Sequence, residues 1–209
     1  MKKIVFLLCL TLSTLGAVQN THAATIDFES LAHQDDLVLD HGAVYEEDGF
    51  LIINEATEAD SGFAPSLASF GTASSSYSGS TALFNDNWEG RTVLKTVKGG
   101  LFDLVSIYLS ELYPETDPLD ASPFDVSFMG LLNDGSTVSQ IFTLDGLAGS
   151  ELFVFDKDFS NLIAVAWLQT PDFHQFDDIN VNPVPEPATL FLLGSGLIGA
   201  AISRKKTAR

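Results

Sequence analysis

The chain is poor in positive charge. Its 209 residues include 28 Asp and Glu but only 10 Lys and Arg, which gives a formal net charge of −18. The stretch from residue 24 to residue 182 contains every acidic residue except Glu186 and only four basic ones, namely Arg91, Lys95, Lys98 and Lys157. Such a surface repels phosphate backbones, so it excludes nucleic acid as a partner. Uncharged polymers, divalent cations and basic partners are not excluded.

Cysteine is almost absent. The one cysteine, Cys9, lies in an apolar stretch near the N-terminus that has the features of a segment removed during export. The rest of the chain cannot form a disulfide bond, so the fold must be held by its core alone or by core and metal together. Residues 24–182 are enough for one domain with a full hydrophobic core.

The sequence also lacks the common catalytic signatures. It contains no Gly-x-Ser-x-Gly elbow, no His-Glu-x-x-His pair and no phosphate-binding P-loop. His33, His41 and His174 are too scattered for a metal-ligand signature. Adjacent carboxylates such as Asp35 and Asp36 point to opposite faces of an extended chain, unlike a pair that flanks a glycosidic bond. We therefore predict that the protein is not an enzyme.

Long apolar runs occur only at the two ends of the chain. At the N-terminus, Lys2 and Lys3 precede an apolar stretch over residues 4–15, and Thr21-His22-Ala23 places small residues at the cleavage-determining positions. This is the pattern of a secretory signal peptide. We predict that residues 1–23 are removed after Ala23 and that the protein is exported.

At the C-terminus, Val184-Pro185-Glu186-Pro187 precedes fifteen uncharged residues, 188–202, and a basic end. As a helix, the uncharged run would reach ~22 Å, which is short of a ~30 Å hydrocarbon core. The basic residues would stay in the cytoplasm, so residues 24–182 would face outwards. The prolines favour an exposed, extended segment before the helix. We predict one short transmembrane helix; a buried core helix is the alternative.

This order of parts resembles the tail of PEP-CTERM proteins, which occur in bacteria with an outer membrane. The resemblance covers residues 183–209 and implies that Pro185, Glu186 and Pro187 form the sorting motif. It implies recognition by an exosortase, a membrane protease-transpeptidase, and transient anchoring in the inner membrane. Processing near the motif would then release the protein to the cell surface or the extracellular space, where members of the family are associated with exopolysaccharide and biofilm matrix.

Residues 24–182 show the pattern of an all-β domain, because apolar residues recur with period two between turn residues. Asn133-Asp134-Gly135 predicts a hairpin between strands over residues 124–132 and 138–144. Residues 162–168 are apolar on both faces, which predicts a central strand. The pattern further predicts a strand pair over residues 43–54 with Glu46-Glu47-Asp48-Gly49 at the bend. It also predicts a strand with Val105, Ile107 and Leu109 on one face, and a surface loop over residues 69–81.

These strands predict an antiparallel two-sheet sandwich with jelly-roll-like connections, and an immunoglobulin-like sandwich is the nearest alternative. The stretch resembles the β-sandwich domains that precede PEP-CTERM tails and, more distantly, galactose-binding-like jelly rolls. The residues that carry this likeness are 26–29, 99–104 and 176–179. The likeness implies a role in carbohydrate binding.

Acidic residues at both ends of the domain predict a calcium site. The first and last strands of a sandwich often lie side by side, and Ca²⁺ takes six to eight oxygen ligands in irregular geometry. The alternative is a set of solvated carboxylates at strand ends. The predicted ligands are Asp27, Glu29, Asp177, Asp178 and Asn180.

The segment Asn85-Asp86-Asn87-Trp88-Glu89-Gly90 predicts a sugar-binding site. An aromatic ring can stack on the apolar face of a sugar while amides and carboxylates bind its hydroxyl groups. We assign Asn85, Asn87, Trp88 and Glu89 to this role. The alternative is that Trp88 closes the core beside a turn.

Together these features predict an exported, exosortase-processed surface or matrix protein whose sandwich associates with extracellular polysaccharide. A structural or adhesive matrix protein that binds other proteins is the first alternative, and a glycan-active enzyme is the second. The predicted partners are the exosortase, the polysaccharide and, transiently, the inner membrane.

Overall fold

The computed structural model describes residues 23–57, 64–87, 90–113, 119, 121–169 and 173–185. Every strand pairing among them is antiparallel, and a single 3₁₀ turn, η1 (Glu29–Leu31), is the one helical element. The all-β prediction is therefore confirmed. The predicted signal peptide, apart from Ala23, and the predicted C-terminal helix lie outside the described residues.

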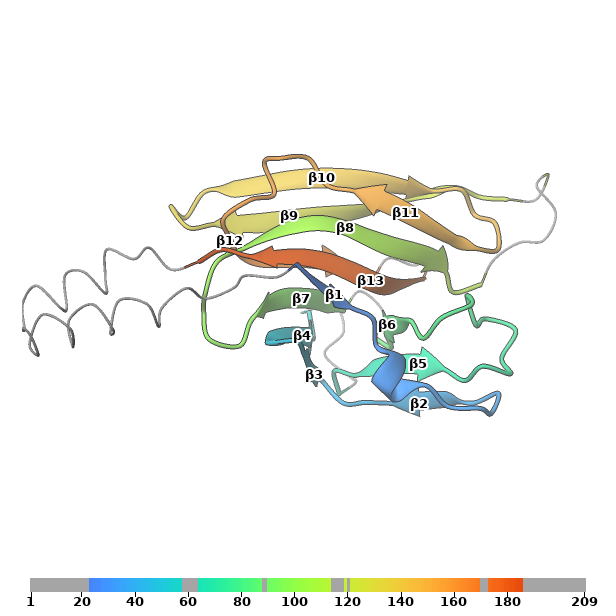
Figure 1. Cartoon of the computed structure of the whole chain (residues 1–209). Coiled ribbons are helices and arrows are strands. Elements are labelled where there is room, and N and C mark those ends of the chain that lie inside the picture. The colour runs from blue at the N-terminus through green and yellow to red at the C-terminus, as the bar shows by residue number, and fades with distance from the viewer. Residues whose placement is uncertain are drawn as a thin grey trace, which may run out of the picture.

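The strands form one curled sheet that folds into two layers (Figure 1). The first layer has the order β3-β4-β7-β12-β9-β10, with β3 (Val44–Glu47), β4 (Phe50–Glu55), β7 (Arg91–Thr96), β12 (Leu162–Leu168), β9 (Phe124–Leu132) and β10 (Thr137–Leu144). The second layer has the order β2-β5-β6-β13-β8-β11, with β2 (Val38–Asp40), β5 (Leu67–Phe70), β6 (Leu83–Asn85), β13 (His174–Pro183), β8 (Phe102–Glu111) and β11 (Ser150–Val154). A short strand, β1 (Ala24–Ile26), pairs with β13.

The chain crosses repeatedly between the layers. It passes from the second layer to the first after β2, β6, β8 and β11, and from the first to the second after β4, β7, β10 and β12. One pair, Leu162 with Phe102, links β12 to β8 across the edge where the layers meet. Repeated crossing of this kind is the jelly-roll connection that the sequence predicted.

Aromatic side chains fill the space between the layers. Trp167 of β12 meets Phe176 of β13 edge-on with ring centroids 5.0 Å apart, and Phe50 of β4 meets Phe102 of β8 in the same way at 5.4 Å. All four side chains are buried. Each such burial contributes about 1.5–3 kcal/mol, and edge-on ring pairs add to it. These rings form part of the hydrophobic core that holds the described domain, which contains no cysteine.

Turn chemistry fixes the hairpins where the sequence placed them. Asp48 and Gly49 have φ angles of 47° and 81° between β3 and β4, the left-handed geometry that an Asp-Gly turn favours. β9 and β10 pair around the predicted turn, in which Gly135 has a φ of 84°. The predicted loop over residues 69–81 begins slightly later, because β5 extends to Phe70.

Two expectations about strand faces need correction. Val105 does not share the inward face of Ile107 and Leu109 but is exposed. The reason is a bulge in β8 at this residue, which reverses the alternation. β12 is central, as predicted, but its outer side chains Ile163 and Leu168 are partly exposed, because no described element covers that face.

Candidate functional site

The predicted pairing of the first and last strands is confirmed. Ala24 of β1 faces Val181 of β13, and Ile26 faces Ile179. β13 then bulges, because the four residues from Asp177 to Asn180 face the three residues of β8 from Tyr108 to Ser106. Asp178 occupies the bulge with a φ of 44°. Bulges re-aim side chains, and this one brings consecutive carboxylates of β13 to the end of β1.

Four carboxylates gather there, and we call them the strand carboxylates: Asp27, Glu29, Asp177 and Asp178. Burial raises the pKa of Asp177 to about 7, with smaller contributions from the charges of Asp178 and Glu29. Burial also raises the pKa of Asp178, and the charges of Asp27 and Glu29 add to the shift. No ion pair among the described residues involves these groups. The cluster therefore carries uncompensated negative charge.

Hydrogen bonds anchor part of the cluster. The backbone N–H of Thr81 donates to Oε1 of Glu29 at 2.9 Å, and the hydroxyl of Ser80 donates to Asp177. The backbone N–H of Asp178 donates to Oδ1 of Asp177 at 2.7 Å. Residues 80 and 81 belong to the loop after β5, which sequence reasoning did not connect with the cluster.

The fifth predicted metal ligand, Asn180, already uses its amide. Its Oδ1 accepts from Oγ1 of Thr25 at 2.8 Å and its Nδ2 donates to Oγ of Ser106 at 3.1 Å. No three strand carboxylates bring oxygen atoms within 4.8 Å of one another in the described residues. The structure gathers the predicted ligands without setting them at ligand distances, and the calcium site stays a prediction.

Two residues of the predicted sugar site, Asn85 and Asn87, are buried in an amide network. Nδ2 of Asn54 donates to Oδ1 of Asn85 at 2.6 Å and to Oδ1 of Asn87 at 2.9 Å. Nδ2 of Asn85 returns a bond to Oδ1 of Asn54 at 3.0 Å. The network holds the chain just before Trp88 and Glu89, which lie outside the described residues. Sequence reasoning missed Asn54, although it follows Phe50 and Ile52 on the inward face of β4.

The backbone after this segment is also fixed. The N–H of Gly90 donates to the carbonyl of Asn87 at 3.0 Å, and the carbonyl of Gly90 accepts from the N–H of Gln169 at 2.9 Å. A Cβ atom at Gly90 would lie 2.3 Å from Oδ1 of Asn85, so only glycine fits there. Both flanks of residues 88 and 89 are thus held, and Gly90 lies where β7 begins and β12 ends. The sugar-binding role of the segment stays a prediction.

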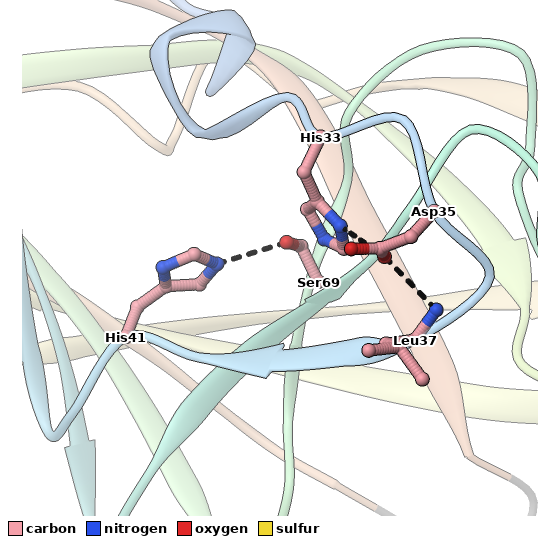
Figure 2. A network of polar contacts seen from close by, with 5 residues as sticks. All are labelled: His33, Asp35, Leu37, His41 and Ser69. Carbon is pink, nitrogen blue, oxygen red and sulfur yellow. Dashed lines mark hydrogen bonds and ion pairs between the residues drawn. The ribbon is translucent and has the colours of Figure 1, made fainter.

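Two of the described histidines contact a Ser or an Asp side chain, and they do so in two separate pairs (Figure 2). Nε2 of His41 lies 2.8 Å from Oγ of Ser69, whereas Nδ1 of His33 lies 2.7 Å from Oδ1 of Asp35. A nucleophilic relay needs one histidine that contacts both the hydroxyl and the carboxylate. Asp35 instead receives the N–H of Leu37 at 3.0 Å, so these residues brace the turn before β2.

The outer face of the first layer is apolar along one line. Successive paired residues from β3 to β9 form a row across five strands, which we call the transverse row: Val44, Ile53, Val93, Ala166 and Met129. Met129 is 52 % exposed, and Ile141 and Leu168 nearby are also exposed. Five strands spaced by ~4.8 Å make a row about 19 Å long.

A polar hollow of about 440 Å³ lies at one end of the domain. It lies beside the β9–β10 turn and the segment between β11 and β12. Its lining combines amides, carboxylates, a hydroxyl and one ammonium group with two apolar side chains: Leu132, Asn133, Asp134, Val138, Lys157, Asp158, Ser160 and Asn161. Sequence reasoning did not identify this hollow, because its lining comes from segments that become neighbours only in the fold.

The last strand leads directly into the tail. Pro183 is the last residue of β13, the N–H of Val184 donates to the carbonyl of Leu101 at 2.8 Å, and Pro185 is exposed. Residues 183–205 match the PEP-CTERM protein-sorting motif. The resemblance seen in the sequence is confirmed for this segment. Glu186 and Pro187 lie outside the described residues, and the described part of the chain contains no helix of the length and apolarity that a membrane span requires.

No curated protein sequence matches the chain. Solved structures with a similar strand arrangement include a family 29 carbohydrate-binding module, with 11 % identity, 78 % of this chain and 88 % of the module covered, and a TM-score of 0.34. The CBM22-1 xylan-binding domain of Paenibacillus barcinonensis Xyn10C shares 12 % identity over 81 % of this chain and 99 % of that domain, with a TM-score of 0.38. A family 11 module from Clostridium thermocellum, in complex with a mixed-linked tetrasaccharide, shares 10 % identity with this chain. The match covers 71 % of this chain and 97 % of that module, with a TM-score of 0.35. The likeness is loose and gives no residue-to-residue correspondence.

Proposed function

We propose that the protein is exported, processed by an exosortase at its tail, and retained at the cell surface or in the matrix through its sandwich, which binds uncharged extracellular polysaccharide. The observation that carries the sorting part is the motif at residues 183–205, which starts at the last residue of β13. The tail therefore follows the domain without a linker, and processing near Pro185 would leave the sandwich complete.

Three features support a polysaccharide as the partner. The domain is strongly acidic, which disfavours anionic polymers and leaves neutral ones. The transverse row offers an open apolar strip about 19 Å long on which an extended chain could lie. Trp88 lies in the sequence between Asn87 and Gly90, whose positions are fixed by hydrogen bonds, and stacking on an aromatic ring is a strong way to hold a sugar.

Affinity gel electrophoresis with neutral polysaccharides tests this proposal on the exported protein. We expect retardation of the wild type and its loss in Trp88→Ala and in Met129→Lys, which places a charge in the transverse row. Leu152→Lys is the matched control, because Leu152 is an equally exposed residue of β11 in the other layer. Equal retardation of wild type, Trp88→Ala and Met129→Lys would show that this face does not bind the polymer.

The exposed apolar side chains also favour a second function, adhesion to other proteins. Met129, Ile141 and Leu168 form apolar surface of the kind that protein partners cover. Binding of matrix proteins by this face, without retardation by any neutral polysaccharide, would select this alternative.

Calcium at the strand carboxylates is part of the same proposal. Their uncompensated charge and the raised pKa values of Asp177 and Asp178 show that the cation-free cluster is electrostatically unfavourable. A bound Ca²⁺ would offset this repulsion and stabilise β1 against β13. We expect chelation to lower the melting temperature of the wild type and added calcium to restore it, and we expect both changes to be smaller in Asp27→Asn/Asp178→Asn. An unchanged melting temperature in chelator would refute calcium binding.

A further inference from the structure

A second group of carboxylates lies at the opposite end of the domain from the tail (Figure 1). It combines Glu111, the last residue of β8, with Asp145 in the loop after β10 and Glu151 in β11. One oxygen atom from each of the three lies within 4.8 Å of the others. Two ligands on opposite sides of a Ca²⁺ ion, each ~2.4 Å away, are separated by ~4.8 Å, so these atoms can share one ion. We call them the loop carboxylates.

Strand register explains how the group forms. β8 and β11 pair so that Ser150 faces Ser110 and Glu151 faces Leu109, which places Glu111 beside the start of β11. The loop from Asp145 to Gly149 then folds over this end. A Cβ atom on Gly146 would lie 2.7–2.9 Å from the backbone of Ser122, so the loop is packed against the segment before β9.

Each loop carboxylate uses one oxygen to hold the loop. Oε1 of Glu111 accepts the N–H of Gly146 at 2.8 Å, and Oε1 of Glu151 accepts the N–H of Asp145 at 3.1 Å. Oδ1 of Asp145 accepts the N–H of Leu147 at 2.8 Å. These bonds orient the three carboxylates and leave the second oxygen of each one available.

The second oxygen atom of Glu111 gives evidence for a bound ligand that is independent of the distances between the carboxylates. The Glu111 side chain is only 5 % exposed, and its Oε2 atom is buried without a hydrogen-bond partner. A buried carboxylate oxygen that lacks a partner is costly, and native proteins rarely leave one. No Lys, Arg or His among the described residues pairs with the group. Burial raises the pKa of Glu111, and the charges of Glu151 and Asp145 add to the shift.

We propose that the loop carboxylates bind one Ca²⁺ ion, with Oε2 of Glu111 as the buried ligand. Asp145 is exposed and Glu151 half-buried, so water can complete the six to eight oxygen ligands that calcium takes. The ion ties the β10–β11 loop to β8 and stabilises this end of the sandwich. This site is separate from the strand carboxylates and does not depend on polysaccharide binding.

Equilibrium dialysis of the exported protein against calcium tests the proposal. Glu111→Gln and Asp145→Asn/Glu151→Gln keep the shape of the side chains and an acceptor for each loop N–H, while removing charge. We expect each variant to bind one Ca²⁺ ion fewer per chain than the wild type. The matched control Asp27→Asn/Asp178→Asn changes the strand carboxylates and should keep the ion at the loop.

The melting temperature gives a second readout. Calcium should raise the melting temperature of Asp145→Asn/Glu151→Gln by less than that of the wild type, because the variant lacks the loop carboxylates. The proposal is overturned if the loop variants bind as many ions as the wild type at equal free calcium, or if the wild type binds none. A calcium-dependent rise in the melting temperature of Asp145→Asn/Glu151→Gln equal to that of the wild type would overturn it too.

Discussion

Replacing Asp177 by Asn should stabilise the calcium-free protein at neutral pH but not in acid. Asp177 is 3 % exposed and has a pKa of about 7, raised from 3.8 mainly by burial. Since its pKa is raised on folding, the folded state holds a proton that the unfolded state releases. The wild type therefore has its full stability below pH 3.8 and loses part of it as the pH rises towards 7. Asn carries no charge at any of these pH values, so the variant has no such loss.

The size of the effect follows from the pH interval. Between pH 5 and pH 7 the unfolded carboxyl group is ionised and the folded one is not, and each unit is worth ~1.4 kcal/mol, or about 2.7 kcal/mol in all. Asp177 is bonded to Ser80 in the loop after β5, and movement of that loop would admit water and screen the charge. We therefore expect the stability difference between Asp177→Asn and wild type to grow by about 2 kcal/mol from pH 5 to pH 8.

Urea unfolding of both proteins in chelator at pH 5, 6, 7 and 8 measures this difference. A growth of 2 kcal/mol corresponds to a relative shift of the midpoint by about 1 M. Comparing the two proteins matters because His174, with a pKa lowered by burial to about 3, destabilises both of them as the pH falls below 6.5. A difference that is the same at pH 5 and pH 8 would refute the idea that Asp177 is buried as an acid.

Three further outcomes follow from single residues. His174→Leu should remove the loss of folding stability, ~1.4 kcal/mol per pH unit, that the wild type shows below pH 6.5. An unchanged dependence of the melting temperature on acid pH in this variant would contradict the prediction. Gly130→Ala should destabilise the protein by about 1–3 kcal/mol, because the added Cβ would lie 2.7 Å from Cδ2 of Leu162. In Gly135→Ala, in the open turn, the Cβ meets no neighbouring atom, so this variant should show only the strain of its positive φ. The midpoints of urea unfolding compare the two variants. Millimolar calcium should reverse the Asp177→Asn effect at pH 8, because the ion favours the ionised wild-type carboxylate, and a persistent advantage of the variant in calcium would count against metal at this cluster.

The sequence predicted the features of the fold that depend on local chemistry. Asp48-Gly49 and Asn133-Asp134-Gly135 specify their hairpins through the turn conformations that these residues prefer. The pairing of β1 with β13 followed from the closure of a sandwich rather than from any local signal. The bulges could not be predicted from the sequence. The bulge at Asp178 depends on the register of β13 against β8, which neither strand encodes alone.

The residues of the candidate sites could also be predicted only in part from the sequence. Acidic residues near both ends of the domain were visible, but the distances between them depend on the bulge and on the loop that carries Thr81. Glu111 was missed, although it continues the inward series of Ile107 and Leu109 with a charged residue. Polar residues at inward positions of strands, Glu111 and Asn54 among them, are the signal that would have located both the loop carboxylates and the amide network.

The two processing events that we predict act on the same end of the domain, and this makes them jointly necessary for release. Ala24, the expected first residue after signal-peptide cleavage, faces Val181 of β13, two residues before the sorting motif begins (Figure 1). We expect an uncleaved signal peptide and the apolar tail to enter one membrane, where either one would suffice to hold the domain. We expect Ala23→Phe and Pro185→Ala/Pro187→Ala each to leave the protein in the membrane fraction, while the wild type is released. The control Ala24→Ser changes only the first residue of β1 and should be released like the wild type. Release of either blocked variant would show that its terminal segment is not an anchor.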